Sequence, residues 1–287
     1  FSPGGDPYGS VTQPTTFGSG GGSDLDNVVP GRAGGGAIRL VVDGTLSLSG
    51  VIEANGNSSA GASEGGGAGG SVWIDATTIT GVTGVVRANG GNGNGSSGGR
   101  SGGGAGGRIA VYTDNPFPAG FNTRVETVGG TSGEAGGLDG GDAAAGTVFL
   151  SQAGDNTLII DNNGSNGRMT VLSDPAIFDP VFVGDIIVRE QGNAGPAPGV
   201  ALDLHITGDV IVESNSRFIA TGRGFGADAG PGAGMFNNNA GAGAGHGGEG
   251  GDVALGGFSP GGDPYGSVTE PTTFGSGGGS DLDNVVP

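Results

Sequence analysis

Apolar and polar residues alternate along several short stretches of the chain. In residues 37–56, Ile38, Leu40 and Val42 occupy every second position. Alternation in short runs bounded by Gly, Asp or Asn is typical of β-strands with one buried face. Residues 37–56 therefore predict three short strands separated by turns.

The same pattern returns further along the chain. Residues 71–90 align with 37–56 without a gap, and both stretches end in Ala-Asn-Gly. Residues 201–222 keep the pattern with two extra residues, looser copies begin at Arg108 and Thr147, and 168–192 is a poorly matched sixth. Three short strands in about 20 residues form one coil of a parallel β-helix, and stacked coils bury a continuous core. We therefore predict an all-β fold, a right-handed parallel β-helix (β-solenoid) with about five to seven coils.

Individual residues have defined places in such a fold. The apolar residues of successive coils are expected to point inward in columns: Ile38, Leu40, Val42, Val72, Ile74, Ile109, Val111, Val148, Leu150, Leu202 and Leu204. The Asn-Gly pairs 55–56 and 89–90 are expected at corners, because both residue types tolerate the left-handed backbone region.

Long glycine-rich excursions separate the predicted coils. They span 57–70, 91–107, 131–146 and 223–250, and they contain many of the 72 glycines of this 287-residue chain. Such segments form flexible loops, or they stack as extended or polyproline-II-like chains, since no Cβ prevents close backbone approach. The sequence leaves both alternatives open.

A much longer repeat encloses this pattern. Residues 258–287 repeat residues 1–30 with one difference, Glu270 in the place of Gln13, at an offset of 257 residues. Near-identity at such an offset is typical of tandem arrays, so we expect the chain to be a stretch of a longer polypeptide. We divide it into a Pro/Gly-rich joint (1–30), the body of one repeat (31–257) and the start of the next repeat (258–287).

Charge and cysteine content exclude several classes of function. The formal net charge is −18, with ten arginines and no lysine, so the surface repels nucleic acid and anionic membranes. The absence of cysteine excludes disulfides and thiolate catalysis. No apolar stretch approaches the ~20 residues of a membrane span.

Calcium is the candidate cofactor. The candidate ligands Asp24, Asp26, Asp139 and Asp142 lie in Gly/Asp-rich stretches similar to the nonapeptide of calcium-binding β-rolls. The nonapeptide does not recur in tandem, so solvated aspartate turns are the alternative.

Two kinds of glycosylation site are candidates. Asn57, Asn94 and Asn163 lie in Asn-x-Ser sequons. Thr12, Thr15 and Thr16 flank Pro14 and could carry O-linked sugar. The alternative is chance, because Asn, Ser and Gly are abundant in this chain.

The chain offers little for catalysis. Its two histidines are His205, which is expected to point outward from a strand, and His246, which lies among glycines. Neither has a nucleophile at a recognisable spacing. We predict that the protein is not an enzyme.

Two pairs of segments resemble known proteins. Residues 43–56 (DGTLSLSGVIEANG) and 208–222 (GDVIVESNSRFIATG) look like coils of secreted bacterial β-helix proteins, such as filamentous-haemagglutinin-like adhesins and other giant repetitive surface proteins. Residues 65–74 (GGGAGGSVWI) and 102–111 (GGGAGGRIAV) are similar to glycine-rich extracellular repeat proteins. The resemblance implies secretion, a location at the cell surface or in an extracellular matrix, and an adhesive or scaffolding role.

Three functions follow as expectations. The first is a structural repeat of an extracellular filament or matrix fibre, in which units stack head to tail and the partner is another copy of the chain. The second is a cell-surface adhesin that binds glycans or other cells. The third, more remote, is a β-helix carbohydrate-active enzyme.

Overall fold

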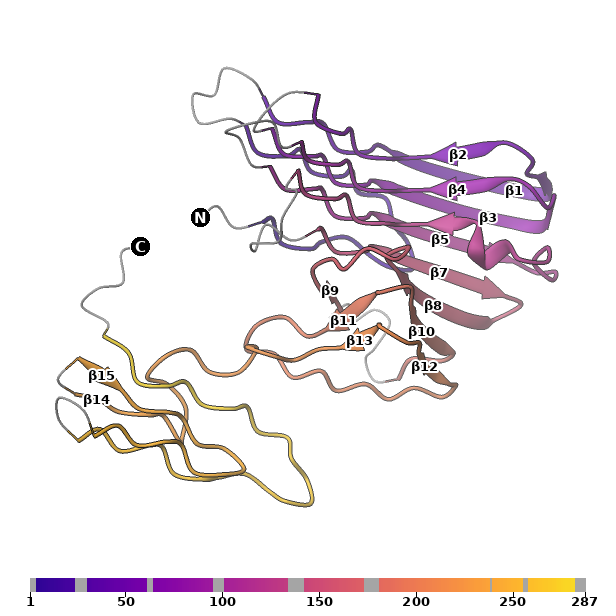
Figure 1. Cartoon of the computed structure of the whole chain (residues 1–287). Coiled ribbons are helices and arrows are strands. Elements are labelled where there is room, and N and C mark those ends of the chain that lie inside the picture. The colour runs from indigo at the N-terminus through magenta and orange to yellow at the C-terminus, as the bar shows by residue number, and fades with distance from the viewer. Residues whose placement is uncertain are drawn as a thin grey trace. The chain divides into compact units, whose positions relative to one another are not determined.

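The fold is taken from a computed structural model of the chain, which describes residues 4–23, 30–60, 64–94, 101–133, 142–172, 181–237, 239–254 and 258–281. The chain forms two compact units (Figure 1). Unit 1 comprises Phe1–Gly195 and Leu204–Ile219, and unit 2 comprises Pro196–Asp203 and Ala220–Pro287.

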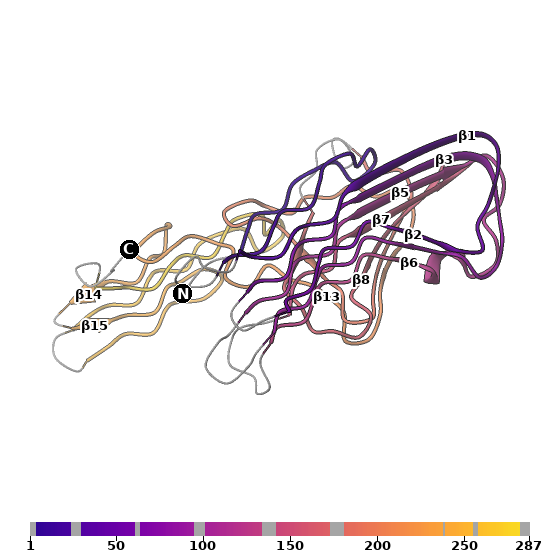
Figure 2. The ribbon, with the colours of Figure 1, turned by 90° about the horizontal axis from the view of Figure 1, so that it is seen from above.

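The main element of unit 1 is a seven-stranded sheet with the strand order β1-β3-β5-β7-β8-β10-β12. Its strands are β1 (Ala37–Ser47), β3 (Ser71–Thr80), β5 (Arg108–Thr113), β7 (Thr147–Gln152), β8 (Asp155–Asp161), β10 (Asp185–Arg189) and β12 (Val210–Val212). All neighbouring strands are parallel except β7 and β8. Figure 2 shows β1, β3, β5 and β7 running side by side and continuing into segments outside the strands.

A second, parallel sheet contains β2 (Val51–Glu53), β4 (Val85–Arg87) and β6 (Val125–Glu126). The apolar core lies between the two sheets, because it combines Val72 and Ile74 of β3 with Val86 of β4. In β3 the side chains alternate: Val72 and Ile74 are buried, whereas Asp75 is exposed. Burial of this alternating face stabilises the sheet pair.

The remaining elements are short. Unit 1 also has a parallel sheet of β9 (Thr170–Val171), β11 (Asn193–Gly195) and β13 (Arg217–Phe218), and a 3₁₀ turn η1 (Phe121–Thr123). Unit 2 has the antiparallel pair β14 (Phe236–Asn237) and β15 (Ala240–Gly241). Strands thus make up almost all of the regular secondary structure of the described residues.

The prediction of a single right-handed parallel β-helix is wrong. In the described residues, the strands are distributed over four separate sheets in two units, and β7 and β8 are antiparallel. These two strands form a hairpin, because Ala153 and Gly154 have φ angles of 49° and 93° and positive φ at both central residues gives a tight two-residue turn. The stretch that begins at Thr147 is therefore this hairpin and not a coil of a helix.

The expected inward residues divide into two groups. Val72, Ile74, Ile109, Val111, Val148 and Leu150 are buried in the core, and Ile38, Leu40 and Val42 are partly buried against it. Leu202 and Leu204 are partly buried and lie outside the core cluster.

Candidate functional site

The glycine-rich segments of unit 1 pack against one another in an ordered array. One line of backbone hydrogen bonds runs from Gly18 N to Gly35 O and from Gly35 N to Ala68 O, both at 2.8 Å. The line continues in the next segments, from Gly69 N to Ala105 O at 2.8 Å. We call this the glycine array: segments 18–22, 31–36, 54–59, 65–70, 88–93, 102–107, 127–131 and 143–146. Of the two alternatives left open by the sequence, ordered stacking is the one observed here.

Hydrogen bonds in the array run in a second direction as well. Gly91 N donates to Gly67 O, Gly104 N donates to Gly91 O, and Gly130 N donates to Gly104 O, each at 2.8 Å. Each of these segments is therefore bonded to more than one neighbour. Backbone groups outside the regular strands are satisfied in this way without a β-ladder.

The donors that reach one neighbouring segment recur every third residue. The pairs are Gly56 N to Asn89 O with Ser59 N to Asn92 O, Gly66 N to Gly102 O with Gly69 N to Ala105 O, and Gly90 N to Val128 O with Gly93 N to Thr131 O. A polyproline-II helix has three residues per turn. The spacing is therefore the one expected if each segment is such a helix.

The array requires glycine because the backbones approach too closely for a side chain. A Cβ atom on Gly104 would meet Gly67 O, and one on Gly90 would meet Gly104 O, both well inside the 3.0 Å that real Cβ atoms essentially never cross. Gly102 lies in the same region, but a Cβ there would meet nothing within 4 Å. Glycine is thus required at individual positions, and not at every glycine of the glycine-rich segments.

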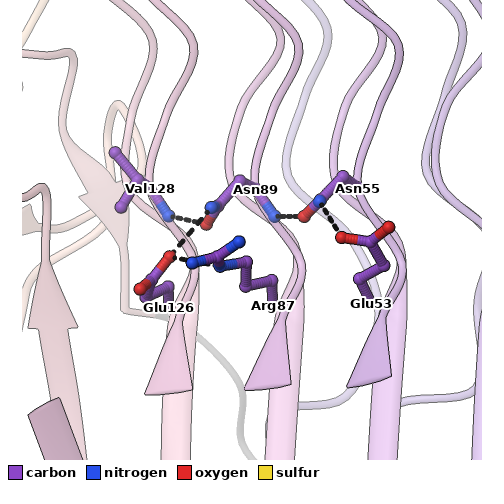
Figure 3. A network of polar contacts seen from close by, with 6 residues as sticks. All are labelled: Glu53, Asn55, Arg87, Asn89, Glu126 and Val128. Atoms are coloured by element: carbon purple, nitrogen blue, oxygen red, sulfur yellow. Dashed lines mark hydrogen bonds and ion pairs between the residues drawn. The ribbon is translucent and has the colours of Figure 1, made fainter. Parts of the chain in front are cut away.

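Side-chain amides connect successive segments at the end of the β2–β4–β6 sheet (Figure 3). Asn55 Oδ1 accepts a hydrogen bond from Asn89 N, and Asn89 Oδ1 accepts one from Val128 N, both at 2.8 Å. We call Asn55 and Asn89 the asparagine ladder. Each side-chain oxygen accepts a hydrogen bond from a backbone N–H of the next segment, and this bond adds to the backbone bonds that join the same segments.

Carboxylates hold the ladder amides in place. Asn55 Nδ2 donates to Glu53 at 3.2 Å, and Asn89 Nδ2 donates to Glu126 at 3.3 Å. Arg87 Nε lies 2.9 Å from the same Glu126 oxygen (Figure 3). These contacts fix which end of each amide faces the neighbouring backbone.

A second ladder lies three residues further along the same segments. Ser58 Oγ accepts from Asn92 N and Asn92 Oδ1 accepts from Thr131 N, both at 3.0 Å. The equal offset from the asparagine ladder agrees with three residues per turn. The side chains in both ladders are thus bonded to the backbone of neighbouring segments.

The ladder residues do not lie where they were predicted. The Asn-Gly pairs 55–56 and 89–90 were expected at corners in the left-handed region, but none of these four residues is among those with positive φ. They lie in extended segments of the array. The available signal was the asparagine at equal positions of the two aligned stretches, followed three residues later by a second polar residue, Ser58 or Asn92.

Three of the calcium candidates, Asp24, Asp26 and Asp139, lie outside the described residues. Asp142 is described, and its Oδ1 accepts a hydrogen bond from Ser132 N at 2.9 Å. Within the described ranges, no three His, Cys, Asp or Glu side chains are grouped closely enough to hold a metal ion. A calcium site stays a prediction.

The glycosylation candidates differ in accessibility. Asn57 and Asn163 are exposed, whereas Asn94 is half-buried and its backbone is bonded to Ser101 Oγ. Thr15 and Thr16 are exposed, and Thr12 is half-buried. Modification of these residues stays a prediction.

The two histidines lie in different settings. His205 is exposed between the partly buried Leu204 and Ile206, which confirms its outward position. His246 Nε2 lies 2.9 Å from Thr273 Oγ1, and its ring packs edge-on against Tyr265 with centroids 4.9 Å apart. His246 therefore contacts the second copy of the joint.

A shallow hollow of about 410 Å³ lies beside the 3₁₀ turn η1. Its walls include Phe117, Phe121, Leu150 and Ile187, and Asp155 is the ionisable residue at its edge. Polar side chains such as Gln152 and Thr157 also line the hollow, so polar and apolar groups contribute to it about equally.

No helix in the described part of the chain has the length and apolar character needed to cross a membrane. Comparisons of the chain with protein-family models, with curated proteins and with solved structures found no match.

Proposed function

We propose that the protein is a structural repeat of an extracellular filament or matrix fibre, in which consecutive repeats join head to tail through the 30-residue joint. The glycine array and its ladders support this proposal, because backbone hydrogen bonds, together with the ladder side chains, hold neighbouring segments together. An array built from bonds between successive segments can be extended by adding segments at its ends.

The observation that carries the proposal is the shared conformation of the two joint copies. Tyr8 Oη donates to Phe17 O at 2.6 Å, and Tyr265 Oη donates to Phe274 O at 2.5 Å. Ser19 Oγ and its counterpart Ser276 Oγ lie 2.8 and 2.7 Å from the same hydroxyls. Gly9 and Gly266 both have positive φ, at 83° and 93°. The joint therefore keeps one local structure in two different surroundings, as a repeated connector should.

The extracellular location is part of the proposal and derives from the resemblance to secreted repeat proteins. The net charge of −18 favours a hydrated surface and mutual repulsion of finished fibres. The contacts within the glycine array depend little on this charge, because most of them join backbone atoms.

An adhesin that binds glycans or cells is the second candidate. The exposed aromatic residues Tyr8 and Phe17 favour it, since exposed aromatic rings are common in recognition surfaces. However, their counterparts Tyr265 and Phe274 are partly covered by unit 2. This difference favours a role in contacts between repeats.

Electron microscopy and denaturing electrophoresis of the natural protein test the proposal. We expect filaments with an axial repeat, and a mass equal to many repeats if the units are covalently linked. Subunits that exchange joints without covalent linkage would instead run near the 27.2 kDa of this chain. A monomer without any axial repeat would contradict the filament, and binding to a glycan array by that monomer would favour the adhesin.

A further inference from the structure

The two copies of the joint use different atoms to bind their surroundings. In the first copy, the amides of Gly18 and Gly21 donate to Gly35 O and Arg32 O, both at 2.8 Å. The carbonyls of the same copy accept at two other positions: Ser19 O from Ala68 N at 2.9 Å and Gly22 O from Gly65 N at 3.0 Å. All these partners belong to the beginning of the repeat body.

The second copy binds the end of the repeat body. Its carbonyls accept from the glycine-rich segment 225–234: Gly275 O from Phe225 N at 2.9 Å, Gly278 O from Asp228 N at 3.0 Å and Gly277 O from Gly234 N at 3.1 Å. Its amides donate to the same region and to the following segment: Gly277 N to Ala229 O at 2.8 Å and Gly279 N to Ala242 O at 2.9 Å.

The offset of 257 residues allows the two sets to be compared atom by atom. Gly275, Gly277, Gly278 and Gly279 correspond to positions 18, 20, 21 and 22. The first copy uses the amides of positions 18 and 21 and the carbonyls of 19 and 22. The second copy uses the carbonyls of positions 18, 20 and 21 and the amides of 20 and 22. No atom belongs to both sets.

The side chains divide in the same way. Val11 in the first copy is 3% exposed, whereas its counterpart Val268 is 98% exposed. Phe17 is 72% exposed, whereas its counterpart Phe274 packs edge-on against Phe225, with ring centroids 5.9 Å apart. The valine side of the joint is therefore covered by the beginning of a repeat, and the aromatic side by the end of a repeat.

We infer that a joint between two repeats binds both of them at once, as a two-sided bridge within the glycine array. The occupant of the aromatic side of the first copy is the segment 225–246 of a preceding repeat. The occupant of the valine side of the second copy, around Val268, is the beginning of a following repeat, which corresponds to residues 31–112. Chains of the polyproline-II type can bond to neighbours in several directions around their axis, so the two sets of bonds are compatible.

This inference deepens the proposed filament and rests on it, because the occupants are further copies of the repeat. It also explains why an apolar residue as exposed as Val268 occurs in the second copy. In an uninterrupted array, every joint except the terminal ones would be covered on both sides.

A chain with one additional repeat tests the bridge. Residues 1–257 are placed before the full 287-residue chain, so that the middle joint has a repeat on each side. Amide hydrogen exchange is then measured by NMR on glycine-labelled protein. In the 287-residue chain we expect slow exchange at Gly18 and Gly21 and fast exchange at Gly20 and Gly22, whose amides have no acceptor among the described residues. In the middle joint all four amides should exchange at least tenfold more slowly than unprotected amides.

A matched pair of variants supplies an independent readout. In the 287-residue chain, Val11→Asp should destabilise unit 1, whereas Val268→Asp should leave the unfolding midpoint unchanged. In the longer chain, Asp at the corresponding valine of the middle joint should be destabilising, and so should Ala at the corresponding phenylalanine. If only one of these two middle-joint variants is destabilising and only two of the four amides are protected, the bridge is wrong. This result would leave the filament standing, whereas natural protein without an axial repeat would overturn the filament.

Discussion

Units 1 and 2 both contain stacked glycine-rich segments, but only unit 1 combines them with an extended apolar core. Its core joins two sheets and includes fully buried residues such as Ile74, Ile109 and Val111. Among the described residues of unit 2, only Pro196 and Ala242 have buried apolar side chains. The difference indicates two ways of stabilising the same repeat.

Unit 2 must depend mainly on hydrogen bonds and close contacts between backbones. A Cβ on Gly250 would meet Gly243 O, and one on Gly262 would meet Gly232 O. The net contribution of one hydrogen bond to the free energy of unfolding is only about 0.5–1.5 kcal/mol. Many such bonds are lost together, however, if the segments separate. Unit 2 should therefore be sensitive to any added side chain and insensitive to losses of apolar area.

The largest expected effect is in the core of unit 1. Ile109→Ala removes a fully buried side chain and should reduce the free energy of unfolding by about 2–5 kcal/mol. Urea denaturation, followed by hydrogen exchange and mass spectrometry, assigns the loss to each unit. Protection should fall in unit 1 and stay unchanged in unit 2. Equal losses in both units would contradict separate stabilisation.

The next largest effect concerns the close contacts of the glycine segments. Gly104→Ala in unit 1 and Gly250→Ala in unit 2 place a Cβ against a neighbouring carbonyl, and each should cost about 1–3 kcal/mol. The controls Gly102→Ala and Gly251→Ala place a Cβ where nothing lies within 4 Å. They should be neutral or stabilising by up to about 1 kcal/mol.

Chemical denaturation of the four glycine variants measures these differences. The loss caused by Gly250→Ala should be a larger fraction of the free energy of unfolding of unit 2 than the loss caused by Gly104→Ala is of that of unit 1. If packed and open positions respond alike, the glycines serve flexibility and not close packing.

A smaller effect is expected in the asparagine ladder. Asn89→Ala removes the acceptor of Val128 N, and an unsatisfied backbone donor costs about 1–3 kcal/mol where it is shielded from water. Water reaches this half-buried edge, so the lower end of the range is expected. Asn57→Ala is the control, because Asn57 is exposed and its described contacts are made by its backbone. Faster exchange at Val128 NH in the Asn89 variant alone would confirm the ladder.

The strands of unit 1 could be predicted from the sequence because they bury one face. The alternation at Val72 and Ile74 follows directly from that burial. The reversal at Ala153 and Gly154 was missed, because the stretch that begins at Thr147 has the same alternation as a parallel strand. Only the φ angles of the turn distinguish the two arrangements.

The candidate site was harder to predict for a different reason. Glycine composition alone does not separate Gly104, which a Cβ would force out of place, from Gly102, which has free space around it. The asparagine ladder depends on partners 34 to 39 residues away, and no local pattern specifies them. The repeated joint was visible in the sequence, but the division of its contacts between two sides requires both copies to be seen in their surroundings.

The smallest effect distinguishes the attachment of the joint in unit 1 from that in unit 2. Tyr112 Oη donates to Thr12 O at 2.9 Å, so β5 holds the first copy by a neutral hydroxyl. Burial raises the pKa of Tyr112 above its ordinary value of 10.0; a hydrogen bond with the Thr12 side chain, distinct from the bond to the Thr12 carbonyl, lowers it in part, and the charge of Asp75 raises it further. A raised pKa means that the folded state retains its proton to higher pH than the unfolded state does. Stability is therefore constant below pH 10 and is lost as the pH rises through the folded pKa.

Denaturation midpoints at pH 9, 10 and 11 should fall for the native chain and fall less for Tyr112→Phe. Tyr8 and Tyr265 are the other tyrosines, and they contribute equally to both proteins. The same slope in both would show that Tyr112 does not hold the joint.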